Sequence, residues 1–196
     1  MNRAEFFAKL EPFHSPSSLL DIELAYTLAK YGHRAQVRRE LGPGGEPLRY
    51  FEHVRRVAVI LVDEMMVSDK TMICAALLHD GFEDTRDLTP EMIEHAFGED
   101  VVRLVKVLSK VPKEGYIERF NRCTDWRAYA IKACDRLDNL RSLDGANDPA
   151  FKAKTLLETE KIYMPLFHRM IALTTPFHKQ ASYDMVAKIW RFLETQ

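Results

Sequence analysis

Apolar side chains recur every three or four positions along most of the chain, a spacing that places them on one face of a helix. Over residues 51–66, for example, His53, Val57, Ile60 and Leu61 form one stripe. No segment shows sustained alternation of apolar and polar residues with β-branched enrichment, so no strand is expected. The pattern predicts helices over 19–34, 51–66, 69–78, 90–97, 99–108 and 125–143, with two or three more after residue 150.

Capping residues indicate where several of these helices begin. Ser18 is expected to cap the first helix, with Asp21 as the acidic member of a capping box. Ser68 is expected to cap the helix over 69–78. Thr89 followed by Pro90 predicts another start, because a capping hydroxyl precedes a proline at the first helical position.

Two segments interrupt the helical pattern. Residues 40–49 contain three glycines and two prolines and are expected to form a loop. The basic segment 109–123 is expected to be irregular. The fold class expected is therefore all-α, with residues 1–196 forming a single domain that is a loose bundle of seven to nine helices.

Charge and cysteine content indicate which partners and which cellular location to expect. The 28 basic and 29 acidic residues give a net charge of −1, so neither nucleic acid nor a membrane surface is expected as the main partner. The N-terminus is too charged for a signal peptide, and the longest apolar run, 72–78, is far too short to span a bilayer. Cys74, Cys123 and Cys134 form no paired motif, which favours free thiols and a cytoplasmic location.

The strongest chemical signal lies where the apolar helix over 69–78 ends. His79, Asp80, Glu83 and Asp84 follow within six positions. Such a cluster is costly to bury unless its members are paired or bound to a cation. The sequence therefore marks this helix end as a candidate metal site.

Two further residues are candidate ligands. His53 lies on the apolar stripe of its helix, and Asp135 is flanked by apolar residues with Asn139 one turn further on. Two imidazoles and two carboxylates suit Mn²⁺, Fe²⁺ or Zn²⁺. A metal held this way lowers the pKa of a bound water, and Glu83 and Asp84 could orient that water or accept its proton.

Each residue also has an ordinary structural interpretation. His53 alone would be read as a half-buried histidine of a helix. Glu83 and Asp84 could be loop carboxylates placed before the next helix, where negative charge is favourable. Arg38 could belong to a solvated helix end. The metal interpretation rests on these residues occurring together and in this order.

The order of these residues resembles a known superfamily. His53, His79-Asp80 and Asp135 resemble the H…HD…D signature of HD-superfamily phosphohydrolases. The similarity is closer to the hydrolase domain of RelA/SpoT alarmone enzymes and to small alarmone hydrolases, including the metazoan SpoT homologue. It covers about residues 22–145, leaving the C-terminal helices 150–196 outside. The matching blocks are His33-Arg34-x-Gln36-x-Arg38-Arg39, Gly45-Glu46-Pro47, Val57-Ala58, His79-Asp80-x-x-Glu83-Asp84-Thr85 and Asp135-Arg136-Leu137-x-Asn139-Leu140-Arg141.

The resemblance implies a reaction and a role for each residue. The substrate would be a small nucleotide, guanosine tetra- or pentaphosphate, whose 3′-pyrophosphate is hydrolysed to give GDP or GTP and pyrophosphate. Arg38 would contact the guanine base, and Asn139 the ribose or adjoining phosphate. The ligands of Mn²⁺ or another divalent transition metal would be His53, His79, Asp80 and Asp135, with Glu83 and Asp84 serving the attacking water.

The sequence also departs from the family pattern. The loop before His53 is longer than in the bifunctional enzymes, and Glu40 stands where a small polar residue is common. Asp138, which replaces a frequent histidine, is expected at the surface or behind the metal ligands. No synthetase domain is expected to fit after the matched region. The alternatives are a phosphohydrolase of another nucleotide, such as NADPH, and a catalytically silent nucleotide-binding module; the oligomeric state is left open.

Overall fold

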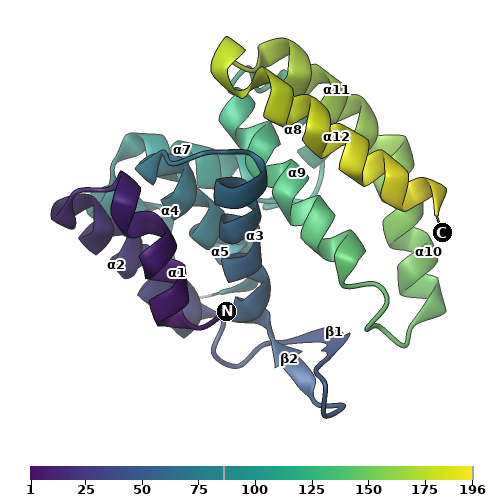
Figure 1. The fold of residues 1–196 in the computed structure, drawn as a ribbon, viewed down its shortest axis with the longest axis horizontal. Coiled ribbons are helices and arrows are strands. Elements are labelled where there is room, and N and C mark those ends of the chain that lie inside the picture. The colour runs from purple at the N-terminus through teal and green to yellow at the C-terminus, as the bar shows by residue number, and fades with distance from the viewer. Residues whose placement is uncertain (86, 196) are drawn as a thin grey trace.

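Helices form most of the chain in the computed structural model, which describes residues 1–85 and 87–195. A two-stranded hairpin joins the second helix to the third (Figure 1). The elements are α1 (Arg3–Leu10), α2 (Pro16–Gly32), β1 (Val37–Leu41), β2 (Pro47–Arg49), α3 (Tyr50–Glu64), α4 (Lys70–Leu78), α5 (Gly81–Asp84), α6 (Pro90–Phe97), α7 (Glu99–Leu108), α8 (Tyr116–Arg122), α9 (Trp126–Arg141), α10 (Pro149–Glu158), α11 (Met164–Leu173) and α12 (Lys179–Glu194).

The all-α class is confirmed, but the described residues contain twelve α-helical segments rather than seven to nine. The excess comes from short helices such as α1, α5 and α8, which are too brief to produce a clear hydrophobic period. No helix in the described part of the chain is long and apolar enough to cross a bilayer.

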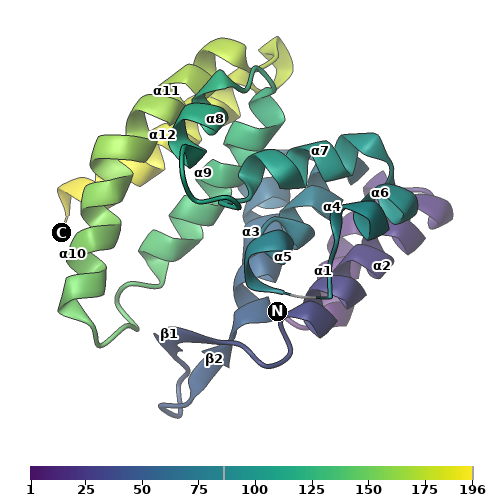
Figure 2. The same ribbon diagram turned by 180° about the vertical axis from the view of Figure 1, so that it is seen from behind.

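Helix α9 lies between two groups of helices (Figures 1 and 2). On one side α3 packs against α9 and α4, and α4 also packs against α2 and α7. On the other side α11 and α12 pack against α9. Because it is covered on both sides, α9 is buried from Ala128 to Asp138. Any charged side chain on this stretch must find partners inside the protein.

The caps expected for α2 and α4 are wrong by one to three positions. Ser15, not Ser18, caps α2, and its hydroxyl accepts a hydrogen bond from the backbone N–H of Ser18. Asp69, not Ser68, caps α4 through the N–H of Met72. Before each of these helices the sequence offers several residues of capping type close together, so the tertiary structure decides which one is the cap. Thr89 and Pro90 do begin α6 as expected.

Residues 40–49 are not a simple loop, because β1 and β2 pair as an antiparallel hairpin. The strand pattern was missed because the half-buried side chains of β1 are charged ones, Arg38 and Glu40. The hairpin turns at Gly45, whose positive φ of 82° suits glycine. β1 also pairs with the segment after α9 through Glu40 and Ala146, which places the hairpin beside the end of that helix.

The basic segment 109–123 is likewise more regular than expected. It contains α8, which begins after Gly115 in the left-handed region, with φ of 65°. Tyr116 and Phe120 lie one turn apart on α8, and both are buried. A helix of seven residues with two buried positions is too short to show a helical period in the sequence.

Candidate metal centre

Three packed helices supply the four expected ligands. His53 lies in the first turn of α3, His79 and Asp80 follow the end of α4, and Asp135 lies in the middle of α9. Since α3 packs against both α4 and α9, the four side chains converge in the interior. None is more than 5% exposed.

The ligand atoms of His53, His79 and Asp80 all lie within 4.8 Å of one another. The Nε2 atom of His79 is 3.0 Å from Oδ2 of Asp80, and the Nε2 atom of His53 is 3.7 Å from the same oxygen. Asp135 joins this group through Oδ1, which is 3.2 Å from Nε2 of His53 and 3.9 Å from Nε2 of His79. The structure therefore brings together all four residues expected as metal ligands.

The hydrogen bonding of His79 fits a bound cation. Its Nδ1 lies 2.8 Å from the carbonyl oxygen of Ala76, which can only accept, so Nδ1 carries the proton. In the neutral ring the lone pair is then on Nε2, which is buried and has no hydrogen-bond partner among the described residues. A lone pair facing the oxygen of Asp80 is repulsive unless a positive charge lies between them. The donor set of imidazole nitrogens and carboxylate oxygens therefore fits a divalent transition metal.

The electrostatics of the cluster lead to the same conclusion. Burial alone would lower the pKa of His53, and Arg38 lowers it further, but the neighbouring carboxylates of Asp135, Asp138 and Asp80 outweigh both and raise the pKa to about 10. Burial opposes the charged form of Asp80, yet the nearby histidines hold its pKa well below its ordinary value. The carboxylates thus stay ionised and require positive charge at the imidazoles or from a bound cation.

Two contacts of the ligands were not anticipated from the sequence. The Nζ atom of Lys132 is buried and lies 2.7 Å from Oδ2 of Asp135. The hydroxyl of Tyr50 donates to Oδ2 of Asp80 over 2.7 Å. A lysine inside an apolar run, three residues before an expected ligand, was a signal that could have revealed Lys132. Nothing in the sequence indicated Tyr50.

The residues expected to serve a water lie on α5, directly after the ligands. The backbone N–H of Glu83 donates to the carbonyl oxygen of Asp80 over 3.2 Å. The Glu83 carboxylate accepts hydrogen bonds from the backbone N–H of Lys110 at 2.8 Å and from its Nζ at 3.2 Å. These contacts tie Glu83 to the basic segment that begins at residue 109. The side chain of Asp84 lies outside the described residues.

The residues expected to bind substrate adjoin the metal centre. The guanidinium of Arg38 donates to Oδ1 of Asn139 at 2.9 Å and to Oγ of Ser142 at 3.0 Å. Asn139 in turn donates to Oδ1 of Asp135 over 2.6 Å, so it touches both Arg38 and a candidate ligand. Arg38 lines a pocket of about 230 Å³. The pocket is lined by Val37, Arg38, Arg39, Glu40, Tyr50, Ser142, Ala146 and Phe151.

The model of the HD domain family matches residues 25–171 of the chain. The chain belongs to the HD domain family, as the order of His53, His79-Asp80 and Asp135 indicated.

Within this family, the curated relatives matched include (p)ppGpp hydrolases. The chain is 38% identical over 166 residues to a guanosine-3′,5′-bis(diphosphate) 3′-pyrophosphohydrolase of Aquifex aeolicus, covering 80% of this chain and 22% of the relative. It is 37% identical over 158 residues to the bifunctional (p)ppGpp synthase/hydrolase SpoT of Escherichia coli, covering 74% of this chain and 21% of that protein. The chain thus spans about a fifth of the length of these relatives.

A solved structure matches nearly end to end. It is that of a metazoan orthologue of SpoT that hydrolyses ppGpp and plays a role in starvation responses. The TM-score is 0.71 at 26% sequence identity, and the match covers 93% of this chain and 97% of that one.

Proposed function

We propose that this protein is a metal-dependent hydrolase that removes the 3′-pyrophosphate of guanosine tetra- or pentaphosphate. The observation that carries the proposal is the buried convergence of His53, His79, Asp80 and Asp135 beside a pocket lined by Arg38 and Tyr50. The activity of the matched relatives and of the metazoan structural neighbour supports the choice of substrate.

The metal would be held by His53, His79, Asp80 and Asp135. Mn²⁺ is proposed because the resemblance to RelA/SpoT hydrolase domains implies it, and the mixed nitrogen and oxygen ligands suit this ion as they suit Fe²⁺ or Zn²⁺. When bound, a divalent metal polarises phosphate oxygens and lowers the pKa of a coordinated water. The three cysteines are free, which is consistent with a reaction in the reducing cytoplasm.

The net reaction needs one water. An oxygen–phosphorus bond forms between the water and the 3′-pyrophosphate, and the bond from phosphorus to the ribose 3′ oxygen breaks. The ribose oxygen gains a proton, and GDP and pyrophosphate are released from guanosine tetraphosphate. Glu83 is the proposed proton acceptor, with its carboxylate oriented by Lys110, and Asp84 is proposed to assist.

The pocket of about 230 Å³ is the proposed nucleotide site. Arg38 presents a planar cation there, with its Cζ 5.7 Å from the ring centre of Tyr50, and such a cation can stack on a base or pair with a phosphate. Asn139 would contact the ribose or the adjoining phosphate. Because Asn139 also holds Asp135, a nucleotide in this pocket would lie next to the metal.

The test is a manganese-supplemented assay on guanosine tetraphosphate, with NADPH and other nucleotides in parallel and Asp80→Asn as the control. We expect GDP and pyrophosphate in equal amounts from the wild type and neither from Asp80→Asn. Activity confined to NADPH or another nucleotide would disprove the guanine assignment of Arg38 but support the metal centre. Failure on every nucleotide by protein with bound metal would contradict the proposed reaction.

A further inference from the structure

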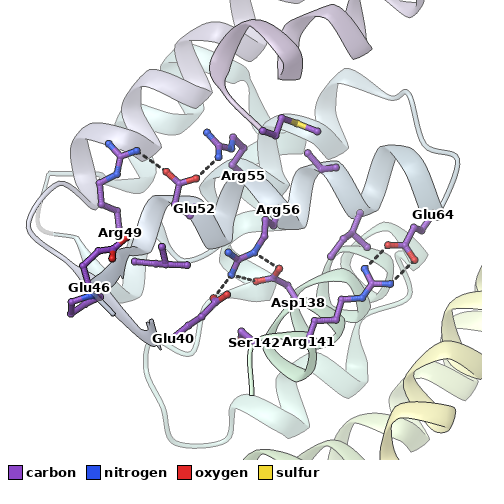
Figure 3. A pocket seen from close by; sticks show the side chains of 15 residues that line it. Glu40, Glu46, Arg49, Glu52, Arg55, Arg56, Glu64, Asp138, Arg141 and Ser142 are labelled. Atoms are coloured by element: carbon purple, nitrogen blue, oxygen red, sulfur yellow. Dashed lines mark hydrogen bonds and ion pairs between the residues drawn. The ribbon is translucent and has the colours of Figure 1, made fainter. Parts of the chain in front are cut away.

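A second and larger groove, of about 700 Å³, lies beside the metal centre between the hairpin, α3 and the end of α9 (Figure 3). Many of the residues that line it are charged. They are Glu40, Glu46, Arg49, Glu52, Arg55, Arg56, Glu64, Asp138 and Arg141.

The four arginines of this groove are all paired with carboxylates of the same groove, so they do not form a free anion site. Glu52 binds both Arg49 and Arg55. The carboxylate of Glu64 binds Arg141. Arg56 differs from the other three because one of its partners, Asp138, is buried and reaches the metal centre.

Both oxygens of Asp138 are held by Arg56. The Nε atom of Arg56 donates to Oδ1 over 2.6 Å, and its Nη2 donates to Oδ2 over 3.1 Å (Figure 3). The same Nη2 lies 2.6 Å from Oε2 of Glu40 on β1. The Asp138 carboxylate, only 2% exposed, therefore has a fixed orientation.

The fixed carboxylate of Asp138 in turn orients the ring of His53. Its Oδ2 lies 2.7 Å from Nδ1 of His53. A carboxylate that accepts the proton of Nδ1 leaves the other nitrogen, Nε2, directed at Asp80 and Asp135. Arg56 also supplies positive charge next to a third buried aspartate, so Asp138 can stay ionised close to the two carboxylates of the cluster.

We propose that Asp138 and Arg56 are positioning residues that fix the ring of His53 and thereby set the affinity of the centre for its metal. Glu40 extends the network to the hairpin and contributes less, because its carboxylate acts on the centre through Arg56. Hydrogen-bonded carboxylates behind metal-binding histidines typically account for a 10- to 100-fold effect on metal affinity. This inference rests on the metal centre of the proposed function but does not depend on which nucleotide is the substrate.

The experiment is calorimetric titration of Mn²⁺ into metal-free protein. We expect Asp138→Asn to weaken binding about 10- to 100-fold and Arg56→Ala to weaken it less. Arg56→Ala added to Asp138→Asn should have little further effect, because Arg56 acts through Asp138. Arg55→Ala is the matched control: it removes the neighbouring arginine of the same groove, whose partner is Glu52, and should leave the affinity within about twofold.

A spectroscopic readout separates positioning from a general loss of stability. In Zn²⁺-loaded protein with ¹⁵N-labelled histidine, the Nδ1–H of His53 should give a strongly hydrogen-bonded proton signal. Asp138→Asn should weaken that hydrogen bond and shift the signal, while circular dichroism confirms that the variant is folded.

The outcomes distinguish this inference from the proposed function. Unchanged metal affinity in folded Asp138→Asn, or equal losses in Arg55→Ala and Arg56→Ala, would overturn the positioning role. A wild type that binds neither Mn²⁺ nor Zn²⁺ would overturn the metal centre and this inference together. Metal binding weakened by Asp138→Asn in a protein inactive on guanosine tetraphosphate would support the positioning role and contradict only the proposed substrate.

Discussion

The metal centre and the neighbouring nucleotide pocket are built in different ways. The candidate ligands come from α3, α4 and α9, which pack against one another, and each ligand is almost completely buried. Residues of β1, of the segment that follows α9 and of α10 line the pocket. Arg38 is only half-buried there. The candidate metal ligands are thus fixed by the core, whereas Arg38, which is proposed to contact the base, lies on a hairpin at its edge. Changes in the hairpin can alter recognition while the packing of the ligands is preserved.

Removing the metal should give the largest effect and should separate the two regions most clearly. A Lewis-acid metal contributes several kcal/mol to such a reaction, so chelation should reduce the hydrolysis rate by at least about 10³-fold. The helix content should be unchanged, because apolar packing of α3, α4 and α9 holds the fold. Initial rates and circular dichroism before and after chelation, with Mn²⁺ added back, measure both. Loss of helix on chelation would show that the metal also holds the fold.

Lys132→Met should strongly destabilise the metal-free protein. The substitution removes the cation bound to Asp135 and leaves a buried carboxylate without it, which costs about 3–5 kcal/mol when a buried pair is broken. Urea unfolding in the presence of chelator measures the change. Lys188→Met is the matched control, because Lys188 pairs with Glu64 in a partly exposed position and should cost less than about 1 kcal/mol. Equal effects from the two lysines would contradict the contrast between interior and edge.

Arg38→Ala should affect substrate binding more than chemistry. Loss of one charge-assisted contact is worth about 1.5 kcal/mol, so KM for guanosine tetraphosphate should rise about tenfold with a smaller change in kcat. Steady-state kinetics give both values. Arg34→Ala removes an exposed arginine that pairs with Asp87 outside the pocket, and it should leave KM within about twofold. A collapse of kcat at unchanged KM would instead place Arg38 in the chemical step.

The smallest effect is expected at Glu64, away from the site. Burial would raise the pKa of Glu64, but hydrogen bonds from Arg141 and Lys188 outweigh it and lower the pKa below the ordinary value of 4.5. Stability from a lowered carboxyl pKa is complete above the unfolded-state pKa and is lost as the pH falls through the folded-state pKa. The free energy of unfolding of the wild type should therefore exceed that of Glu64→Gln by up to about 1 kcal/mol at neutral pH. This difference should shrink below about pH 4.5. Urea unfolding at several pH values measures it, and a gap that widens in acid would refute the assignment.

Local sequence determined most helices and half of the candidate site. The 3.6-residue period marked α3 and α7 closely, because each has one continuous apolar face. His79 and Asp80 are adjacent in the chain, so their joint position at the end of α4 was visible without a fold. His53 and Asp135 were added by their order along the chain and by the resemblance to HD hydrolases.

Only the tertiary structure decided which charges meet across elements. Asp138 is hydrogen-bonded to His53 although the two residues are 85 positions apart in the sequence. Arg38 is hydrogen-bonded to Asn139 across 101 positions. No local period encodes such contacts, since they depend on how α3, α9 and the hairpin pack. The hairpin itself was missed because its buried face carries Arg38 and Glu40, whose partners lie on α9 and α3. Charged residues show no strand pattern, and their burial becomes favourable only when distant partners are brought to them.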